Sequence, residues 1–293
     1  MTAPNERAAG AASGPGGSNA PGPVPLSTPA DPPHRTDDDT AVRLPPELSD
    51  AARALFGDRL GLAAAYAQLL ATEGVVRGLI GPREAPRIWD RHLLNCAAVA
   101  ELIPSGASVT DVGSGAGLPG LVLAVARPDL SVTLVEPLAR RTAFLSEAVT
   151  ALGLEATVTV LRARAEDCVP GGPVADLLSP ADIVTARAVA PLDRLAGWCL
   201  PLAVLGGRML AMKGASAADE VAEHRDVIDR FGGGTPVVRW CGAELIEPPT
   251  TVVEIVRERD VVPARAGSSR KAARSGRRSG SDGGPGRGKT RRG

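Results

Sequence analysis

The segment from Val109 to Gly120 constrains this chain more than any other. It reads VTDVGSGAGLPG and holds four glycines in eight positions directly after an apolar run. Glycine adopts backbone conformations that other residues avoid, and it lets another group pack directly against the main chain. The apolar run predicts a strand over 108–112, and the following pattern predicts a helix over 118–126. The glycines therefore predict a tight strand-to-helix turn that a ligand can approach closely.

Apolar runs and helical patterns alternate after this turn. Short apolar runs separated by helices are typical of a parallel sheet that is covered on both faces. The last two runs are joined by CGAELIEPPT without a helix, so we expect an antiparallel pair at the end of the sheet. The sequence thus predicts an α/β fold with the seven-stranded, mainly parallel sheet of Rossmann-like class I methyltransferases. The expected strands span residues 108–112, 131–135, 156–161, 182–185, 207–212, 236–241 and 251–256, and the helices between them span 118–126, 138–152, 191–204 and 216–231.

Composition divides the chain into four parts. Both ends hold almost no large apolar side chains, so they cannot bury enough surface to offset the entropy of ordering. Helical patterns over residues 45–70 and 85–103 precede the first strand. We therefore expect a disordered leader over 1–40, an N-terminal helical extension over 41–105, a cofactor-binding core over 106–260 and a disordered basic tail over 261–293.

Charge is unevenly spread along the chain, although its formal net value is zero. Residues 262–293 hold ten Lys and Arg residues against one acid, which favours a polyanionic partner. The alternative is a solubilising tail in a chain whose basic residues are mostly Arg. Four scattered cysteines and three histidines match no metal-binding pattern, so we expect no metal. Because no apolar run reaches ~18 residues, we expect no membrane span and a cytoplasmic protein.

Two kinds of cofactor need such close approach to a glycine turn: a dinucleotide and S-adenosylmethionine. Residues 115–120 fit Gly-x-Gly-x-x-Gly, the dinucleotide fingerprint, and residues 111–117 fit the acidic-x-Gly-x-Gly-x-Gly loop of S-adenosylmethionine methyltransferases. Asp111 would repel a pyrophosphate but is favourable beside a sulfonium or ammonium cation. Glu136, at the end of the second strand, suits the ribose of either cofactor. S-adenosylmethionine is favoured, while a nicotinamide or flavin dinucleotide and a purely structural turn stay open; the expected loop contacts are Asp111, Gly113, Gly115 and Gly117.

Several motifs in a fixed order carry a resemblance to a known family. Most of it lies in VTDVGSGAGLPGLVLAVARPDLSVTLVEPLARRTAFLSEAV, with WDRHLLNCAAV before this run and RARAED, VTARAVAPLDRLAGWCLPL and GGRMLAMKG after it. In these motifs the chain is similar to ribosomal RNA small subunit methyltransferase G, also called glucose-inhibited division protein B. The resemblance covers roughly residues 55–258.

The resemblance implies methyl transfer from S-adenosylmethionine to N7 of one guanine in 16S ribosomal RNA. The partner is then 16S ribosomal RNA or the small ribosomal subunit, and we expect a monomer. The family commonly has a Pro-Gly-rich basic segment near its last strand, which VVPARAGSSRKAARSGRR replaces only loosely here. By analogy, the cofactor contacts fall on Gly113, Leu118, Glu136, Ala165, Glu166 and Arg187.

The motifs that are missing from the sequence agree with this chemistry. Guanine N7 has a free lone pair, so its methylation needs alignment of donor and acceptor and no general base. The chain has no Asn/Asp-Pro-Pro-Tyr/Phe run for an exocyclic amine and no Pro-Cys nucleophile for a pyrimidine. Two alternatives stay open: a small-molecule methyltransferase, and a non-catalytic RNA-binding or assembly factor that retains a cofactor fold.

Three residues are candidates for the catalytic site. Lys213 ends the fifth strand at the carboxyl edge, where open α/β sheets bind ligands, and it suits contact with guanine O6 or a phosphate. His92 and Asn95 lie at helical spacing before the first strand and are candidates for the pocket wall. The alternative for His92 is a histidine packed on its neighbours. Arg187, after the fourth strand, suits contact with the cofactor or a phosphate.

The aromatic residues limit how RNA can be held. The chain has only three Trp, one Tyr and three Phe, which leaves little capacity for base stacking. We expect Trp89, Trp198 and Trp240 in the core, with base stacking as the alternative. We expect Arg140 and Arg141 on a solvated helix face, with contact to RNA phosphates as the alternative. RNA binding would then depend on phosphate contacts and on RNA shape.

Overall fold

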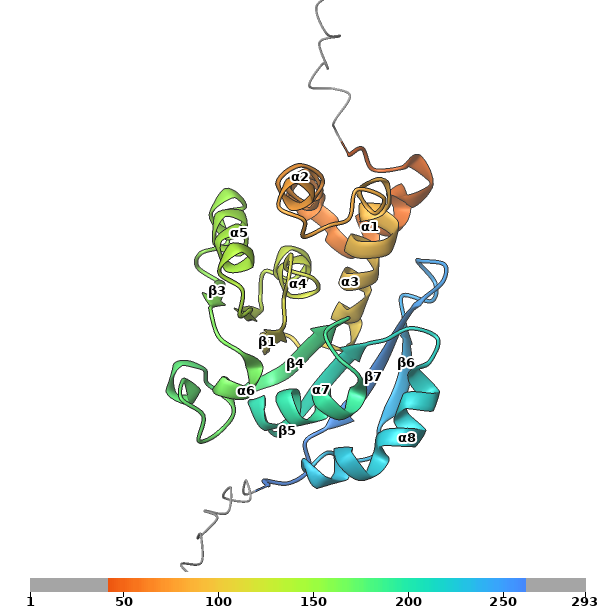
Figure 1. Cartoon of the computed structure of the whole chain (residues 1–293). Coiled ribbons are helices and arrows are strands. Elements are labelled where there is room, and N and C mark those ends of the chain that lie inside the picture. The colour runs from red at the N-terminus through yellow and green to blue at the C-terminus, as the bar shows by residue number, and fades with distance from the viewer. Residues whose placement is uncertain (1–41, 262–293) are drawn as a thin grey trace, which may run out of the picture. The chain divides into compact units, whose positions relative to one another are not determined.

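Seven strands form one sheet in the order β3-β2-β1-β4-β5-β7-β6 (Figure 1). The structure is a computed structural model that describes residues 42–261. The first five strands pair in parallel, whereas β7 is antiparallel to both β5 and β6. The predicted fold class, including the antiparallel pair at the end, is confirmed. The strands are β1 (Ser108–Val112), β2 (Ser131–Val135), β3 (Val158–Leu161), β4 (Ala181–Arg187), β5 (Ala203–Met212), β6 (Val237–Cys241) and β7 (Thr250–Val256).

The register of the parallel strands decides what meets at their carboxyl ends. Val112 at the end of β1 pairs with Val135 on β2 and with Ala186 on β4. These three paired residues therefore lie at one level, and the residue after each lies at the same edge of the sheet, although β4 itself continues to Arg187. Those residues are Gly113, Glu136 and Arg187.

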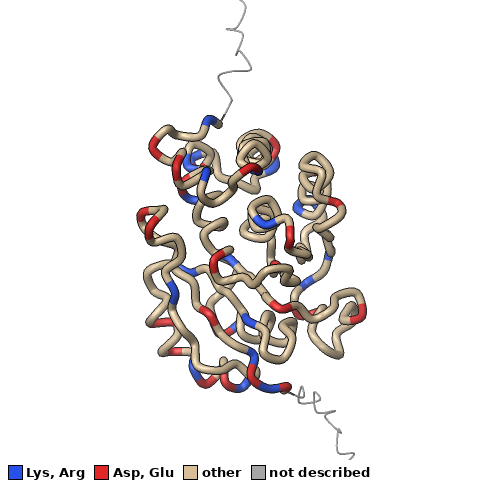
Figure 2. The backbone as a smooth tube through the Cα atoms, turned by 180° about the vertical axis from the view of Figure 1, so that it is seen from behind, with Lys and Arg blue, Asp and Glu red and all other residues tan. Residues whose placement is uncertain are grey.

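Helices cover both faces of the sheet (Figure 1). The first five lie on one face and the last three on the other, and a separate apolar core fills each side. The helices are α1 (Ser49–Phe56), α2 (Leu60–Leu69), α3 (Asn95–Ala98), α4 (Gly120–Ala126), α5 (Ala139–Ala151), α6 (Ala165–Cys168), α7 (Leu192–Cys199) and α8 (Ala217–Arg230). Charged positions of both signs are interspersed along the whole described chain, as Figure 2 shows.

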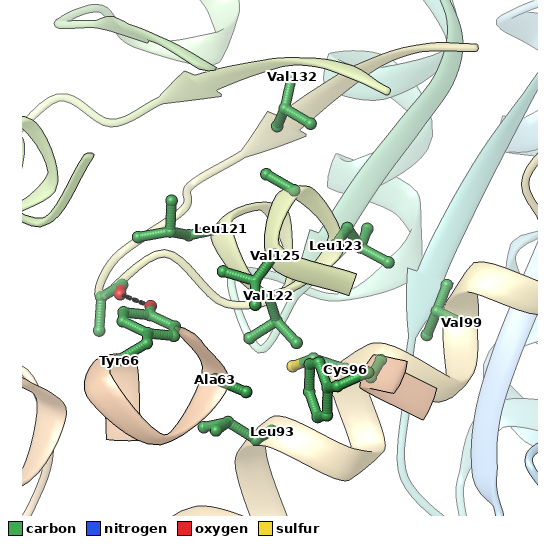
Figure 3. Close-up of a cluster of buried hydrophobic side chains, with 14 of the residues drawn as sticks. Ala63, Tyr66, Leu93, Cys96, Val99, Leu121, Val122, Leu123, Val125 and Val132 are labelled. Carbon is green, nitrogen blue, oxygen red and sulfur yellow. Dashed lines mark hydrogen bonds between the residues drawn. The ribbon is translucent and has the colours of Figure 1, made fainter. Parts of the chain in front are cut away.

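The N-terminal helices share one core with the sheet. Helix α4 is apolar on all sides and buries every residue but its last, so it needs cover from a second layer. Tyr66 from α2 and Leu93 from the helical segment before α3 supply this cover, and both are fully buried (Figure 3). A fully buried side chain of this size contributes roughly 1.5–3 kcal/mol of transfer free energy. The N-terminal helices are therefore integral to the fold.

Turn-forming residues explain where the predicted helices end. The helix expected over 45–70 breaks at Gly57, whose φ is 50°. The helix expected over 191–204 ends at Cys199, because Pro201 follows within a short 3-10 turn and β5 then begins at Ala203. The helix expected over 85–103 forms from several consecutive helical turns between Ala85 and Leu102. The short helix α6 was not expected.

One expectation about a single side chain is wrong. Trp240 lies on the edge strand β6 and is 62% exposed, so it is not a core residue; Trp89 is buried and Trp198 half-buried. Arg140 is exposed, and the Arg141 side chain is 39% exposed while its guanidinium lies 3.6 Å from Glu136.

Two of the predicted parts fall largely outside the described chain. The leader over 1–40 and the tail over 262–293 lie outside the described residues. Among residues 42–261 no helix is long and apolar enough to cross a membrane.

Candidate active site

A cavity of about 760 Å³ opens at the carboxyl ends of the parallel strands. Its lining comes from the glycine turn after β1, from the segments after β2 and β3, and from the end of β4. It includes Gly113, Gly115 and Leu118 of the turn, together with Glu136 and Arg187. Five of the nine residues predicted to bind the cofactor therefore line one cavity, because the parallel register brings these strand ends to one edge.

Backbone conformation explains the glycines of the turn. Gly113, Gly115 and Gly117 have φ values of 69°, 59° and 90°, in the left-handed region that other residues rarely adopt. A Cβ on Gly113 would lie 2.7 Å from a methyl carbon of Val189, and one on Gly117 would lie 2.7 Å from the Tyr66 hydroxyl oxygen. Gly113 thus permits close contact across the cavity wall, whereas Gly117 permits close packing behind the turn.

Asp111 lies behind the turn and outside the cavity lining. Its side chain is fully buried, and its carboxylate accepts hydrogen bonds from the Gly120 amide at 3.1 Å and the Thr185 hydroxyl at 2.8 Å. Burial raises the pKa of Asp111 to about 6, although these hydrogen bonds act to lower it. The carboxylate therefore ties β1, β4 and the start of α4 together behind the glycine turn.

Glu136 forms part of the cavity wall beside the turn. One carboxylate oxygen accepts a hydrogen bond from the Gly115 amide and the other from the Leu138 amide, both at 3.0 Å. The Arg141 guanidinium lies 3.6 Å from the first of these oxygens. Each carboxylate oxygen has a second lone pair, so Glu136 can also accept hydrogen bonds from a diol.

Arg187 and His92 form a polar contact in the cavity wall. A guanidinium nitrogen of Arg187 lies 2.6 Å from Nδ1 of His92, and the other terminal nitrogen donates to the Cys96 sulfur at 3.0 Å. A guanidinium can only donate, so Nδ1 accepts and the ring proton resides on Nε2. Burial and the nearby Arg187 charge lower the pKa of His92 to about 4. His92 is therefore neutral at pH 7, and its basic nitrogen is already occupied.

The other two candidate catalytic residues do not line the cavity. Lys213 donates hydrogen bonds to the Ala190 carbonyl and the Glu220 carboxylate. Asn95 donates to the Asp90 carbonyl at 2.7 Å and accepts from the Thr250 hydroxyl at 2.6 Å. Of the three candidates, only His92 reaches the cavity.

Sequence reasoning missed several residues of the lining. Ala165 and Glu166 lie outside it, while their neighbours Arg164 and Asp167 belong to it. Arg141 and Arg162 add two further guanidinium groups, and apolar walls come from Leu79, Ile80, Leu138 and Val189. The basic pair after β2 and the alternating RARAED run after β3 were the available signals. Leu79 and Ile80 had none, because they come from a turn that precedes β1 in sequence.

The cavity fits a nucleoside-containing methyl donor. Glu136 offers acceptors for a ribose diol, Leu138 an apolar surface for a purine, and Gly113 and Gly115 an exposed backbone. Within residues 42–261 no group of three or more His, Cys, Asp or Glu side chains is arranged to hold a metal ion.

Comparison with known proteins identifies the family. Residues 59–241 match the family described as rRNA small subunit methyltransferase G. The chain belongs to this family. The matched region runs from the N-terminal helices through β6 and includes the whole cavity lining.

Individual relatives are similar in sequence over most of the chain. A ribosomal RNA small subunit methyltransferase G from Salinispora tropica is 72% identical over 234 residues, which cover 80% of this chain and 96% of the relative. The proteins of that name from Corynebacterium efficiens and Nocardioides sp. are 51% and 54% identical, over 78% and 74% of this chain and 96% and 84% of their own lengths. The predicted family is confirmed.

Proposed function

We propose that this chain transfers a methyl group from S-adenosylmethionine to N7 of a guanine in the 16S ribosomal RNA of the small subunit. Family membership supports the reaction class, since the relatives are named ribosomal RNA small subunit methyltransferases. The observation that carries the finer proposal is a donor-sized cavity whose histidine, His92, is neutral and has its basic nitrogen occupied by Arg187. The reaction would take place in the cytoplasm, where ribosomal subunits are.

The cavity residues divide the binding of the donor between them. Glu136 accepts hydrogen bonds from the ribose hydroxyls, while its own position is fixed by the Gly115 and Leu138 amides. Asp167 offers an acceptor for an exocyclic amine on the purine, and Leu138 packs on the ring. When bound, S-adenosylmethionine supplies a methyl group on a sulfonium sulfur, so the cavity needs to hold and align the donor without activating it.

The acceptor atom suits these surroundings. A neutral guanine attacks the methyl carbon with the N7 lone pair; the new N–C bond forms as the S–C bond breaks, and no proton moves. The site must therefore align the two groups, and it needs no base. An exocyclic amine would need a base for its proton, and His92 is not available for that role because Arg187 already donates to its Nδ1.

Arginines at the cavity supply contacts for RNA phosphates. Arg162 and Arg164 are exposed, line the cavity and form no ion pair with other residues in the described part of the chain. Unpaired guanidinium groups beside a ligand cavity favour a polyanionic substrate, because each contact with a phosphate releases a counterion. The basic residues over 262–293 would add to this attraction.

Methyl transfer measured on defined ribosomal substrates tests the proposal. Small subunits and naked 16S RNA would be prepared from a strain that lacks the gene and incubated with the protein and labelled S-adenosylmethionine. We expect one labelled N7-methylguanine in 16S RNA by mass spectrometry. Label on a different base atom would overturn the N7 assignment. Tight donor binding without transfer to either substrate would instead favour an assembly factor.

A further inference from the structure

The loop between β4 and α7 forms the cavity wall that faces the glycine turn. It runs over residues 188–191, and both Ala188 and Val189 line the cavity. Val189 packs so closely on Gly113 that a Cβ there would lie 2.7 Å from its methyl carbon. The position of this loop therefore sets the width of the cavity next to the methyl donor.

Local sequence does not favour the conformation of this loop. Ala188 is the one non-glycine residue of the described chain with a positive φ, at 53°. An alanine in the left-handed region costs free energy, so the surrounding structure must hold it there. Val189 is 38% exposed, so its packing on Gly113 supplies only part of that support. The loop needs a brace from another part of the chain.

Lys213 and Glu220 supply this brace from behind the wall. Lys213 follows β5, and its ammonium donates hydrogen bonds to the Ala190 carbonyl at 3.0 Å and to Glu220 at 2.7 Å. The same Glu220 oxygen accepts a hydrogen bond from the Leu192 amide at 3.1 Å. The pair thus holds the loop at its last residues and at the first residue of α7.

The ion pair of Lys213 and Glu220 is largely shielded from solvent, which preserves its attraction. The Lys213 side chain is 10% exposed and that of Glu220 is 21% exposed, so solvent screens their attraction only in part. Burial acts to raise the pKa of Glu220, but the hydrogen bond and charge of Lys213 outweigh it and the net pKa is lowered. Glu220 is therefore a carboxylate at pH 7. Neither side chain lines the cavity.

We propose that Lys213 and Glu220 are positioning residues which fix the 188–191 loop against the glycine turn and thereby align the methyl acceptor with the donor. This proposal rests on the proposed function for its catalytic consequence. It assigns Lys213 an action through the loop in place of direct contact with the base or a phosphate.

Paired variants distinguish action through the loop from direct contact. Single-turnover methylation of small subunits would be measured for Lys213→Met, Glu220→Gln and the double variant, with donor affinity by calorimetry. We expect each single variant to lower the rate about 10- to 100-fold, because small misplacements of reacting groups are costly. The double variant should be no slower than the slower single variant, and donor affinity should change by less than about threefold. Lys213→Arg should recover part of the rate.

A matched control removes an ion pair elsewhere. Arg239 on β6 pairs with Glu254 at 2.8 Å, and neither lines the cavity. Arg239→Met should leave the methylation rate unchanged. Equal losses in all variants would indicate general destabilisation and overturn the proposal. A loss confined to Lys213→Met, with a weaker salt dependence of RNA binding, would show that Lys213 contacts the RNA directly.

Hydrogen exchange provides a readout that needs no activity. Amides in residues 188–192 should exchange at least about tenfold faster in Lys213→Met and Glu220→Gln than in the parent, while the glycine turn exchanges as before. Unchanged exchange in this segment would overturn the brace whether or not the parent methylates ribosomal RNA. Failure of the parent to methylate, with the exchange difference intact, would contradict the proposed function alone.

Discussion

The two facing walls of the cavity are held in place by different means. The turn after β1 rests on buried contacts: Asp111 accepts two hydrogen bonds below it, and the Tyr66 hydroxyl donates to the Ala116 carbonyl from the N-terminal helices (Figure 3). The loop after β4 rests on a partly exposed ion pair, Lys213 with Glu220.

The difference matches what each wall would contact. A methyl donor has the same shape in every turnover, so a rigid wall built on buried hydrogen bonds suits it. An RNA base would arrive from solution and meet the other wall, whose bracing side chains Lys213 and Glu220 are 10% and 21% exposed. A wall held by buried hydrogen bonds and a wall held by a partly exposed ion pair should respond differently to mutation.

Removal of the buried carboxylate should have the largest effect. Asp111→Ala leaves the Gly120 amide and the Thr185 hydroxyl without their partner inside the protein. We expect the free energy of unfolding to fall by about 4 kcal/mol, measured by urea denaturation. Asp111→Asn keeps a group of the same shape and serves as the control. If the alanine variant were as stable as the parent, the turn would not depend on this buried network.

The pH dependence of stability should reveal opposite contributions from two buried groups near the cavity, Asp111 and His92. The folded-state pKa of Asp111 is raised to about 6 from 3.8 by burial, so its contribution to stability is present below pH 3.8 and is lost as pH rises through 6. The folded-state pKa of His92 is lowered to about 4 from 6.5 by burial and by Arg187, so its contribution is present above pH 6.5 and is lost as pH falls through 4.

Two variants separate these contributions. Between pH 4 and 6.5, relative to the parent, Asp111→Asn should gain stability with rising pH and His92→Gln should lose it, each by about 2 kcal/mol. The free energy of unfolding would be measured by urea titration at each pH. If the curves of unfolding free energy against pH were parallel for the parent and both variants, the opposite pKa shifts of Asp111 and His92 would be contradicted.

Loss of the Tyr66 hydroxyl should destabilise the glycine-turn wall less than loss of the Asp111 carboxylate. Tyr66→Phe keeps the buried ring but removes the hydrogen bond to the Ala116 carbonyl. We expect a loss of about 1 kcal/mol in unfolding free energy and a severalfold weaker donor affinity by calorimetry, with little change in the methylation rate at saturating donor. A slower rate at unchanged donor affinity would mean that α2 acts on the acceptor wall instead.

Removal of positive charge at the cavity should have the smallest effect, which should appear only in the salt dependence of RNA affinity. Arg162→Gln combined with Arg164→Gln removes two unpaired guanidinium groups from the lining. The slope of log affinity for RNA against log salt should become shallower by about 1.5, and donor affinity should stay the same. The same substitution at Arg230, an exposed residue outside the cavity lining, is the control. Equal slopes for both variants would contradict phosphate binding at the cavity.

The sequence was informative wherever neighbouring residues alone decide the outcome. Strands β1 and β2 begin and end as predicted, because short apolar runs between turn residues define them. Gly113, Gly115, Leu118, Glu136 and Arg187 reached the cavity because each follows or ends a parallel strand. Because the strands are parallel and in register, residues that follow their carboxyl ends in the sequence also lie close together in space.

The sequence misled where a side chain finds its partner far along the chain. Lys213 ends a strand at the expected edge, yet its ammonium turns to Glu220 and Ala190. Arg141 was expected on a solvated helix face, and its partly exposed side chain also reaches Glu136 across the cavity wall. Trp240 was expected in the core, but it is exposed because β6 is the edge strand of the sheet.

The sequence by itself determined the order of strands and helices, the glycine turn and the family. Only the tertiary structure decided which side chains face the cavity and which support its walls. Periodicity and turn residues act over a few positions and can be read locally. The contact between Tyr66 and Ala116 spans 50 residues, and that between Arg187 and His92 spans 95, so these partners exist only once the sheet and both helical layers have packed.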